Sequence, residues 1–298
     1  MKIIQQRQKF FVLSAILVIA SIVMLIVWGL KPGIDFRGGV LTEIKFTEKL
    51  PDKTEFQSKL QELNLDDLTI QVSGADKMLV RFISDDDAIN TKVQEKIKSE
   101  YKDAVIEQTA FISSAISKEL KSRAIQATVI AIIGIMIYIM WAFRKVSYPV
   151  ESWKYGLGAV IALAHDIIIT LGVFAWLGHY YGVEVNIPFI AALLTILGYS
   201  VNDTIVIFDR IRENLNRAEA KKNFEDTVNR SINESMSRSL NTSLTVVVVL
   251  LAIIFFGGNS IKYFAVALLV GIVAGTYSSI FVASAILVEA WKRKLKRS

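Results

Sequence analysis

The sequence predicts an α-helical polytopic membrane protein: six transmembrane helices, with one α+β domain between the first and the second helix. Three observations lead to this class. Of the 298 residues 53% are hydrophobic, and the mean hydropathy is +0.44, yet 21% are charged. Six long apolar runs alternate with polar segments, of which only residues 31–122 could form a sizeable folded domain. Lys and Arg gather beside the apolar runs, so the net charge of +6 indicates membrane topology rather than a nucleic-acid partner.

The sequence lacks the residues that are typical of several classes of protein. The chain has no Cys, so it has no disulfide framework. Gly-rich phosphate loops, zinc-ligand spacings and nucleophile elbows are also missing from the sequence. We therefore expect no enzymatic activity, no cofactor and no bound metal.

The first apolar run, residues 10–30, follows a basic amino terminus, residues 1–9. A secretory signal peptide would have a shorter apolar core and a small-residue cleavage site. The polar sequence Lys-Pro-Gly-Ile-Asp follows instead. We expect a retained first helix whose amino terminus lies in the cytoplasm.

The polar block 31–122 shows the periodicities of strands and helices in turn. Val40, Thr42, Ile44 and Phe46 alternate as in a half-buried strand. A helix is expected at 54–63, two short strands at 68–72 and 78–83, a helix from the acidic residues 85–87 to 101, and a last strand at 104–112. This β-α-β-β-α-β order predicts a ferredoxin-like domain.

Five further spans are expected after this domain. They are residues 124–143, 155–177, 187–208, 242–256 and 261–290, followed by a basic tail at 291–298. The last span contains Gly271, Gly275, Ser278 and Ser279, small residues that allow helices to approach closely.

The distribution of Lys and Arg predicts the orientation. The amino terminus, the 144–154 loop, the 209–238 loop and the tail are basic, whereas the loop 178–186 has no Lys or Arg. Basic short loops stay in the cytoplasm. Both termini are therefore expected inside, and the domain outside, which is the periplasmic side of a bacterial inner membrane.

The segment 209–241 carries an apolar stripe on a helix. Its members recur every four residues: Phe224, Val228, Ile232, Met236 and Leu240, with Lys221 and Lys222 on other faces. Such a helix either lies on the inner membrane surface or packs on the underside of the helical bundle.

Polar residues inside the spans are candidates for function. Asn202 and Asp203 lie in the fourth span, where a charge costs about 3 kcal/mol and must face protein or water. Asp203 is also only about 7 Å of helical rise from Phe208, so it could reach water at the interface. In the third span, His165 is either a packed neutral imidazole or functional. Asp166 either bonds to a neighbouring helix or lies on an ion path.

Arg238 precedes the fifth span. Because the fourth and fifth spans run in opposite directions, Arg238 and Asp203 are expected at similar depth. Arg238 is either a positively charged anchor at the cytoplasmic surface or the ion-pair partner of Asp203.

Three long motifs resemble signatures of the SecD/SecF family of protein-export membrane proteins. Residues 33–39, Gly-Ile-Asp-Phe-Arg-Gly-Gly, are similar to the family's entry to its outer domain. Residues 197–213 resemble its fourth-span signature, and 237–243 its fifth-span entry, with Ser239 in place of an expected Thr. His165 and Asp166 also fit its third span. SecD has a much larger outer domain, so the chain resembles the SecF branch.

The resemblance implies a non-enzymatic subunit of the Sec protein translocase in the bacterial cytoplasmic membrane. Such a subunit works with SecD beside the SecYEG channel, with YajC and YidC as further partners, in contact with membrane lipid and the unfolded secretory polypeptide. It uses a gradient of protons, or of sodium in some relatives. The ion-coupling residues implied are Asp203, Arg238, Asp166 and Asn202, and those of the entry motif are Gly33, Asp35, Phe36, Gly38 and Gly39.

Two other functions stay open. A small-molecule or lipid exporter of the same resistance-nodulation-division superfamily would need a second outer domain and usually twelve spans. A passive scaffold of the channel would differ from an ion-driven subunit in tolerating the loss of Asp203.

Overall fold

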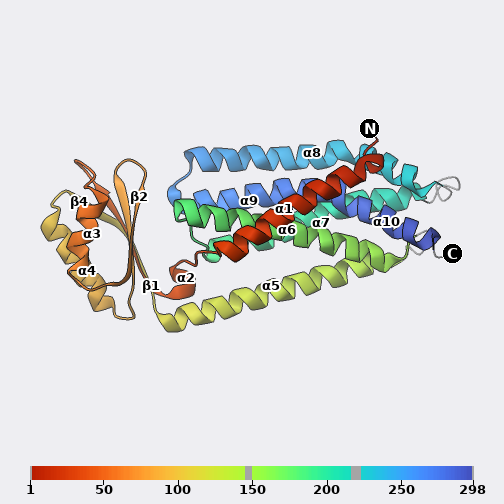
Figure 1. Cartoon of the computed structure of the whole chain (residues 1–298). Coiled ribbons are helices and arrows are strands. Elements are labelled where there is room, and N and C mark those ends of the chain that lie inside the picture. Colours follow the sequence, from red (N-terminus) through yellow and green to blue (C-terminus); the bar gives the residue numbers. More distant parts are fainter. Residues whose placement is uncertain (1, 145–149, 216–222, 297–298) are drawn as a thin grey trace. The chain divides into compact units, whose positions relative to one another are not determined.

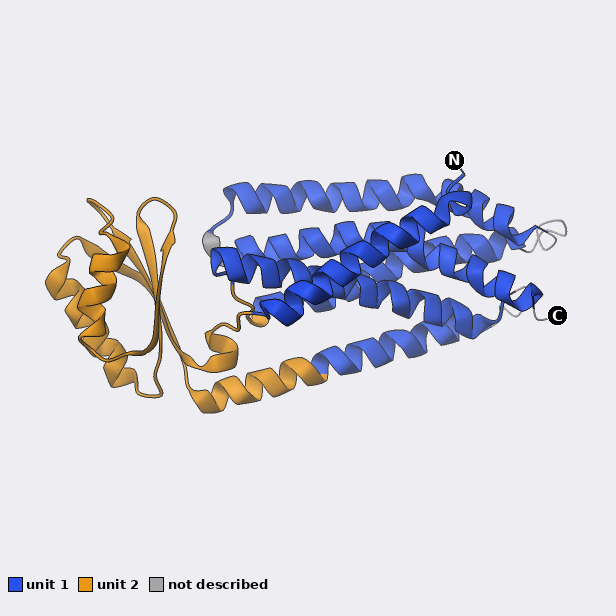
Figure 2. Cartoon of the chain, in the orientation of Figure 1, with its two compact units in different colours: residues 1–30, 127–183, 188–298 blue, residues 31–126, 184–187 orange. Residues whose placement is uncertain are grey.

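The structure, a computed structural model, describes residues 2–144, 150–215 and 223–296. The chain forms two compact units (Figure 2). Unit 1 contains residues 1–30, 127–183 and 188–298, and unit 2 contains residues 31–126 and 184–187. Residues 145–149 of the expected basic loop 144–154, and Lys221 and Lys222 of the segment 209–241, lie outside the described residues.

Unit 2 is built on a four-stranded antiparallel sheet of strand order β2-β3-β1-β4 (Figure 1). Its elements follow in the predicted order: β1 (Gly39–Phe46), α3 (Lys53–Gln61), β2 (Asp66–Ser73), β3 (Lys77–Ile83), α4 (Asp87–Glu100) and β4 (Ala104–Ile112). A short helix, α2 (Ile34–Arg37), precedes β1. This order of elements and strands is the ferredoxin-like arrangement.

The core of unit 2 follows from the alternation along β1. Val40, Thr42, Ile44 and Phe46 are all buried, because every second side chain of a strand points to the same face. The helix α3 adds Phe56 and Leu60 to this face, α4 adds Val93 and Ile97, and β3 adds Met78, Val80 and Phe82.

Acidic residues begin the two helices of unit 2. Asp52 Oδ1 accepts hydrogen bonds from the backbone N–H groups of Thr54 (2.8 Å) and Glu55 (3.2 Å). Asp86 Oδ1 accepts from the N–H of Ala88 at 2.9 Å, which bears out the expected helix start after the acidic run. Asp85 instead accepts from the backbone N–H (2.7 Å) and the hydroxyl (3.0 Å) of Ser114.

Unit 1 is helical. Six helical stretches of the described residues are long and apolar enough to cross a membrane. They are η1 with α1 (Ile4–Gln6 and Arg7–Val27), α5 (Ser114–Ala142, whose first part belongs to unit 2), α6 (Ser152–Tyr181), α7 (Ile187–Leu215), α8 (Phe224–Phe256), and a last stretch of α9 (Asn259–Ser278), a π-helix η2 (Ser279–Ala283) and α10 (Ser284–Leu295). The stretches α6, α7 and α9 to α10 are the most buried, so they form the interior of the bundle.

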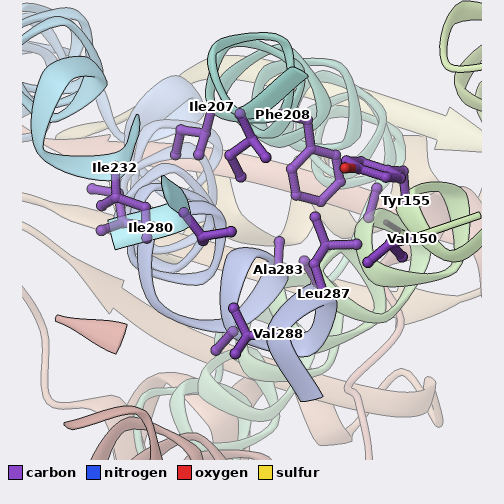
Figure 3. Close-up of a cluster of buried hydrophobic side chains, with 14 of the residues drawn as sticks. Val150, Tyr155, Ile207, Phe208, Ile232, Ile280, Ala283, Leu287 and Val288 are labelled. Atoms are coloured by element: carbon purple, nitrogen blue, oxygen red, sulfur yellow. The ribbon is translucent and has the colours of Figure 1, made fainter. Parts of the chain in front are cut away.

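One end of the bundle holds an apolar core that Figure 3 shows from close by. Tyr155 of α6 stacks on Phe143, with ring centroids 5.5 Å apart, and Phe208 of α7 meets Tyr155 edge-on at 5.3 Å. Leu287 and Val288 of α10 belong to the same cluster and are fully buried. Aromatic pairs of this geometry stabilise a core beyond the burial of their area.

Two glycines permit close approach of helices. A Cβ on Gly172 of α6 would lie 2.5 Å from Ser21 Cα of α1, and a Cβ on Gly271 of α9 would lie 2.2 Å from Ile196 Cδ1 of α7. The expected role of Gly271 as a small residue at a helix contact is confirmed.

Several helices extend beyond the expected spans. The helix α5 begins at Ser114 rather than at residue 124, α7 continues to Leu215, and α8 begins at Phe224 rather than at residue 242. Polar residues of high helix propensity extend these helices, and ion pairs such as Glu119–Arg123 stabilise the extensions. Residues 209–215 of the expected amphipathic segment therefore belong to α7, and its residues from Phe224 on form one continuous helix with the fifth apolar run.

The apolar stripe of α8 packs on the bundle, the second of its two expected positions. Phe224, Val228 and Ile232 are fully buried, and Phe224 contacts Trp291 with ring centroids 5.5 Å apart. Leu240 is 48% exposed. A four-residue repeat advances about 40° per step on a helix, so the stripe turns by about 160° along its length and Leu240 faces outward.

Candidate functional site

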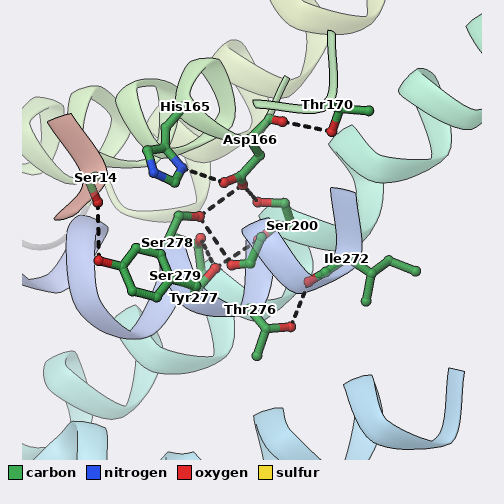
Figure 4. A network of polar contacts seen from close by, with 12 residues as sticks. Ser14, His165, Asp166, Thr170, Ser200, Ile272, Thr276, Tyr277, Ser278 and Ser279 are labelled. Carbon is green, nitrogen blue, oxygen red and sulfur yellow. Dashed lines mark hydrogen bonds and ion pairs between the residues drawn. The ribbon is translucent and has the colours of Figure 1, made fainter. Parts of the chain in front are cut away.

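The most buried ionisable group of the described residues is Asp166, in the middle of α6 (Figure 4). Its side chain is 0% exposed. Its Oδ2 accepts hydrogen bonds from Ser200 Oγ of α7 at 2.6 Å and from Ser278 Oγ of α9 at 2.8 Å. One carboxylate thus joins three helices, so the expected bond to a neighbouring helix is confirmed twice.

His165 lies on the other oxygen of this carboxylate. Its Nδ1 is 2.9 Å from Asp166 Oδ1, whereas its buried Nε2 has no hydrogen-bond partner. The imidazole stacks on Tyr277, with ring centroids 6.0 Å apart. The Tyr277 hydroxyl donates to the carbonyl oxygen of Phe10 at 3.0 Å and accepts from Ser14 Oγ at 3.3 Å. His165 is therefore packed in the bundle and also paired with a carboxylate.

The π-helix η2 begins directly after Ser278. Ser279 Oγ lies 2.7 Å from Thr204 Oγ1 of α7 and donates to the carbonyl oxygen of Ser200 at 3.3 Å. The Ser284 hydroxyl donates to the carbonyl oxygen of Ser279 at 3.3 Å, five residues back. Single-turn π segments inside α-helices often mark functional sites. Here the segment carries hydroxyl groups at the carboxylate network.

Gly275 provides the space for this network. A Cβ at this position would lie 3.0 Å from Ser200 Cβ and 3.4 Å from Asp166 Oδ2. The sequence indicated Gly275, Ser278 and Ser279 only as small residues for packing. The hydroxyls of the two serines, and the space that Gly275 leaves beside Asp166, are a second role, which a hydroxyl-rich patch inside an apolar run could have suggested.

Asp203 is a second buried carboxylate, one turn along α7 from Ser200. It is 7% exposed. Its Oδ2 and the Oγ of Ser239 on α8 are both buried without a hydrogen bond of normal geometry, although the two groups interact electrostatically. A buried carboxylate oxygen without a hydrogen-bond donor among the described residues costs free energy, so Asp203 is an uncommon feature of the bundle.

An ion pair with Asp203, one of the two alternatives for Arg238, is not formed. Arg238 is exposed and lines a hollow with Asp209, Arg210 and Glu213. The next residue, Ser239, faces Asp203 instead, because one step along a helix rotates the side chain by about 100°. Asn202 is also exposed, for the same reason, beside the buried Asp203.

The residues of the 33–39 motif lie in unit 2, where two of them shape the backbone. Gly38 and Gly39 have φ of +81° and +118°. A Cβ on Gly39 would lie 2.4 Å from the carbonyl oxygen of Phe82 on β3, so only glycine fits at the start of β1.

The other motif residues join the segment 184–187 to unit 2. The N–H of Gly33 donates to the carbonyl oxygen of Val185 at 2.8 Å, and Asp35 Oδ2 accepts from the N–H of Ile187, the first residue of α7, at 2.8 Å. The N–H of Phe36 donates to the carbonyl oxygen of Gly33 at 3.0 Å, within α2.

Chemically, the Asp166 network can take up and release a proton, or offer hard oxygen ligands to a small cation. The described residues contain no cluster of three or more His, Cys, Asp or Glu side chains that could hold a metal ion. The hydroxyls of Ser200 and Ser278 can rotate when the carboxylate changes its protonation state.

Comparisons with known proteins agree on one family. Residues 92–293 match the family model "Protein export membrane protein SecD/SecF, C-terminal", and residues 23–49 match "SecD/SecF GG Motif". The protein translocase subunit SecF of Thermobaculum terrenum is 40% identical over 98% of this chain and 94% of its own length. The protein of the same name from Anaerolinea thermophila is 38% identical over 100% of this chain and 97% of its own length.

Two solved structures are also similar. The crystal structure of SecDF, a translocon-associated membrane protein from Thermus thermophilus, matches 98% of this chain with a TM-score of 0.84 and 33% identity. A SecDF structure in a super-membrane-facing form matches with a TM-score of 0.69 and 30% identity. In both cases this chain spans only 39% of the SecDF chain.

Proposed function

Because the chain belongs to the SecD/SecF family of protein export membrane proteins, we propose that it is an accessory subunit of the Sec protein translocase. In this role it pairs with SecD beside the SecYEG channel and uses the transmembrane ion gradient to drive late-stage export of polypeptides. The names of its relatives and its likeness to SecDF support the translocase role. The ion-driven part depends on one observation, the buried Asp166 network.

Besides joining three helices, Asp166 has the properties of a coupling group. Among the described residues it forms no ion pair with Lys or Arg, and its partners are an imidazole and two hydroxyls. Ionisable groups inside membrane spans are rare and indicate ion pathways. When ionised, Asp166 accepts from Ser200 and Ser278; when protonated, it donates either to His165 Nδ1 or to one of the two serine hydroxyls, which must then turn. In the second case a change of protonation alters the contacts between α6, α7 and α9.

Asp203 extends this pathway along α7. Ser200, Asp203 and Thr204 are all buried and lie three and four residues apart, on one face of the helix. A transmembrane voltage of 100 mV is worth about 2.3 kcal/mol for each charge that crosses the field. This energy shifts a two-state equilibrium by about 50-fold if the coupling is complete.

Asn202 and Arg238 have roles other than ion coupling. Both are exposed on this chain. An amide side chain facing lipid lacks hydrogen-bond partners, so we assign the surface of Asn202 to the contact with SecD. Arg238 acts as a positively charged anchor at the cytoplasmic end of α8, and the Lys and Arg distribution puts both termini on that side with unit 2 outside.

The test is export into membrane vesicles that contain SecD and this chain, with and without an imposed ion gradient. Asp166→Asn and Asp203→Asn should keep expression and association with SecD, because a lost neutral hydrogen bond costs only about 1 kcal/mol. Both should lose the gradient-dependent part of export, and Asp203→Glu should keep some of it. The matched control is Asp209→Asn, which neutralises an exposed carboxylate of α7 paired with Arg212 at the surface.

Replacing sodium by choline at constant pH difference identifies the ion. If both Asn variants kept gradient-stimulated export at the wild-type level, the ion-coupling role would be wrong and a passive scaffold would be the better assignment. Transport of a small molecule or lipid by the chain without SecD would favour the exporter instead.

A further inference from the structure

A small cavity in unit 2 contains an unusual group of charges. It has a volume of about 90 Å³, and its lining includes Lys31, Arg37, Asp67, Arg81 and Glu184. Gly33 and Gly38 of the 33–39 motif also line it, and we call it the GG-motif pocket. The volume is well above the 10–15 Å³ or so that one water needs, so a small polar group fits inside.

The charges of the GG-motif pocket do not balance. Arg37 Nη1 pairs with Asp67 Oδ2 at 2.9 Å, and Arg81 pairs with Glu184. Lys31 forms no ion pair with any carboxylate that the structure describes, although Arg81, Arg37 and Asp67 all act on it electrostatically. Three cations and two carboxylates leave a net charge of +1.

This excess positive charge is partly withdrawn from water. The side chains of Arg81 and Glu184 are 19% and 11% exposed, and Arg81 Nε is buried without an acceptor. Burial, together with the positive charges of Arg81 and Arg37, lowers the pKa of Lys31. A bound anion would supply both the missing charge and the missing acceptor.

The backbone around the pocket is held in an uncommon conformation. Asp67 has φ of +52°, and the pairing of β2 with β3 is irregular between Asp66 and Thr69, which directs Asp67 towards Arg37. Such strained positions in non-glycine residues often occur at binding sites.

A backbone hydrogen bond and a glycine hold another part of the pocket lining, around Glu184, in place. The N–H of Val185 donates to the carbonyl oxygen of Lys31 at 2.8 Å, and this pairing holds Glu184 beside the motif. A Cβ on Gly33 would lie 3.1 Å from Glu184 Oε2, so a larger residue would press on this carboxylate.

Few residues separate the pocket from the membrane spans along the chain. Lys31 is four residues beyond Val27, the end of α1, and Glu184 is three residues beyond Tyr181, the end of α6. Four residues span at most about 14 Å. Trp28 stacks on His179, with ring centroids 4.9 Å apart, and meets Tyr180 edge-on, which is typical of the aromatic belt at a membrane interface.

We propose that the GG-motif pocket binds the phosphodiester head group of one phospholipid, with Lys31 and Arg37 on its phosphate oxygens. A phosphodiester carries a single negative charge, which equals the excess positive charge of the pocket. Free inorganic phosphate carries more than one negative charge at neutral pH, and an acidic peptide carries several. This role does not depend on ion coupling.

Native mass spectrometry of the full chain, released from nonionic detergent and titrated with phosphatidylglycerol, tests the proposal. Lys31→Gln should weaken binding of the first lipid by about tenfold or more, because a charge-assisted hydrogen bond is lost. Lys31→Arg should bind within about threefold of wild type, since it keeps the charge. The matched control is Lys92→Gln, which removes an exposed Lys of α4 outside the pocket and should change nothing.

The control ligands are inorganic phosphate and a short acidic peptide. The proposal is overturned if Lys31→Gln and Lys92→Gln bind phosphatidylglycerol alike. It is also overturned if inorganic phosphate or the peptide competes with the lipid at equal concentration, because the pocket would then serve a free anion or a polypeptide. Loss of gradient-dependent export in Asp166→Asn, with lipid binding unchanged, would separate this site from the ion-coupling one.

Discussion

Replacing Gly39 by Ala should destabilise unit 2 strongly. Gly39 begins β1, an interior strand of the sheet, and its φ of +118° is a conformation that residues with a side chain rarely adopt. The new Cβ would lie 2.4 Å from the carbonyl oxygen of Phe82 and 3.2 Å from Ile83 Cα. Both atoms belong to the backbone of β3, so no side-chain rotation relieves the clash.

The loss of unfolding free energy in Gly39→Ala follows from two effects. A residue held in a sparsely populated backbone region costs about 1–3 kcal/mol. Inserting a methyl group into well-packed surroundings costs about 1–3 kcal/mol more. We therefore expect the free energy of unfolding of unit 2 to fall by about 2–6 kcal/mol. Gly74→Ala is the matched control, since Gly74 also has a positive φ, +77°, but no atom lies within 4 Å of the added Cβ.

Hydrogen exchange of the full chain measures this difference directly. Amides of β1 and β3 should exchange about 30-fold faster or more in Gly39→Ala, because each 1.4 kcal/mol is worth about tenfold. Gly74→Ala carries only the backbone term, so these amides should exchange at least about fivefold more slowly in Gly74→Ala than in Gly39→Ala. Equal exchange in the two variants would refute the argument that the clash with β3 requires glycine here.

Two further predictions concern other contacts. Gly172→Ala should lower the unfolding temperature of the purified chain, because its Cβ would meet the backbone of Ser21. Gly198→Ala is the control: its added Cβ has no atom within 4 Å, so the unfolding temperature should stay unchanged or rise. Similar losses in both variants would contradict the close approach of α1 and α6. Hydrogen bonds from Ser114 lower the pKa of Asp85 in the folded chain, so its stabilising effect is complete above the ordinary Asp pKa of about 3.9 and disappears as the pH falls through the folded value. The unfolding temperatures of wild type and Asp85→Asn should therefore differ at pH 7 and converge as the pH falls below the ordinary Asp pKa, and a constant difference would be inconsistent with this role.

The elements of the fold could be predicted from local patterns. Alternation at Val40, Thr42, Ile44 and Phe46 predicted the buried face of β1, and the acidic residues at 85–87 predicted the start of α4. Six apolar runs predicted six helices able to span a membrane. These features depend on residues close together in the sequence, where period and composition determine which face is apolar.

The polar partners could not be predicted in the same way. Asp166 and Asp203 were recognisable as candidates because they interrupt apolar runs. The hydroxyls that contact Asp166 come from Ser200 and Ser278, 34 and 112 residues away. Their contact depends on how three helices are rotated against one another, and no local pattern contains that rotation.

The contacts of Arg238 could not be predicted from the sequence for the same reason. Arg238 and Asp203 were predicted to lie at similar depth in the membrane. Depth depends on the rise along the helix axis, whereas contact depends on the rotation of each side chain about that axis. A difference of one residue moves the side chain by about 100°, so Ser239 faces Asp203 and Arg238 is exposed. The sequence by itself determined which residues enter the membrane spans and the sheet; only the packing of the helices decided which polar groups meet, because contact depends on rotation between elements far apart in the chain.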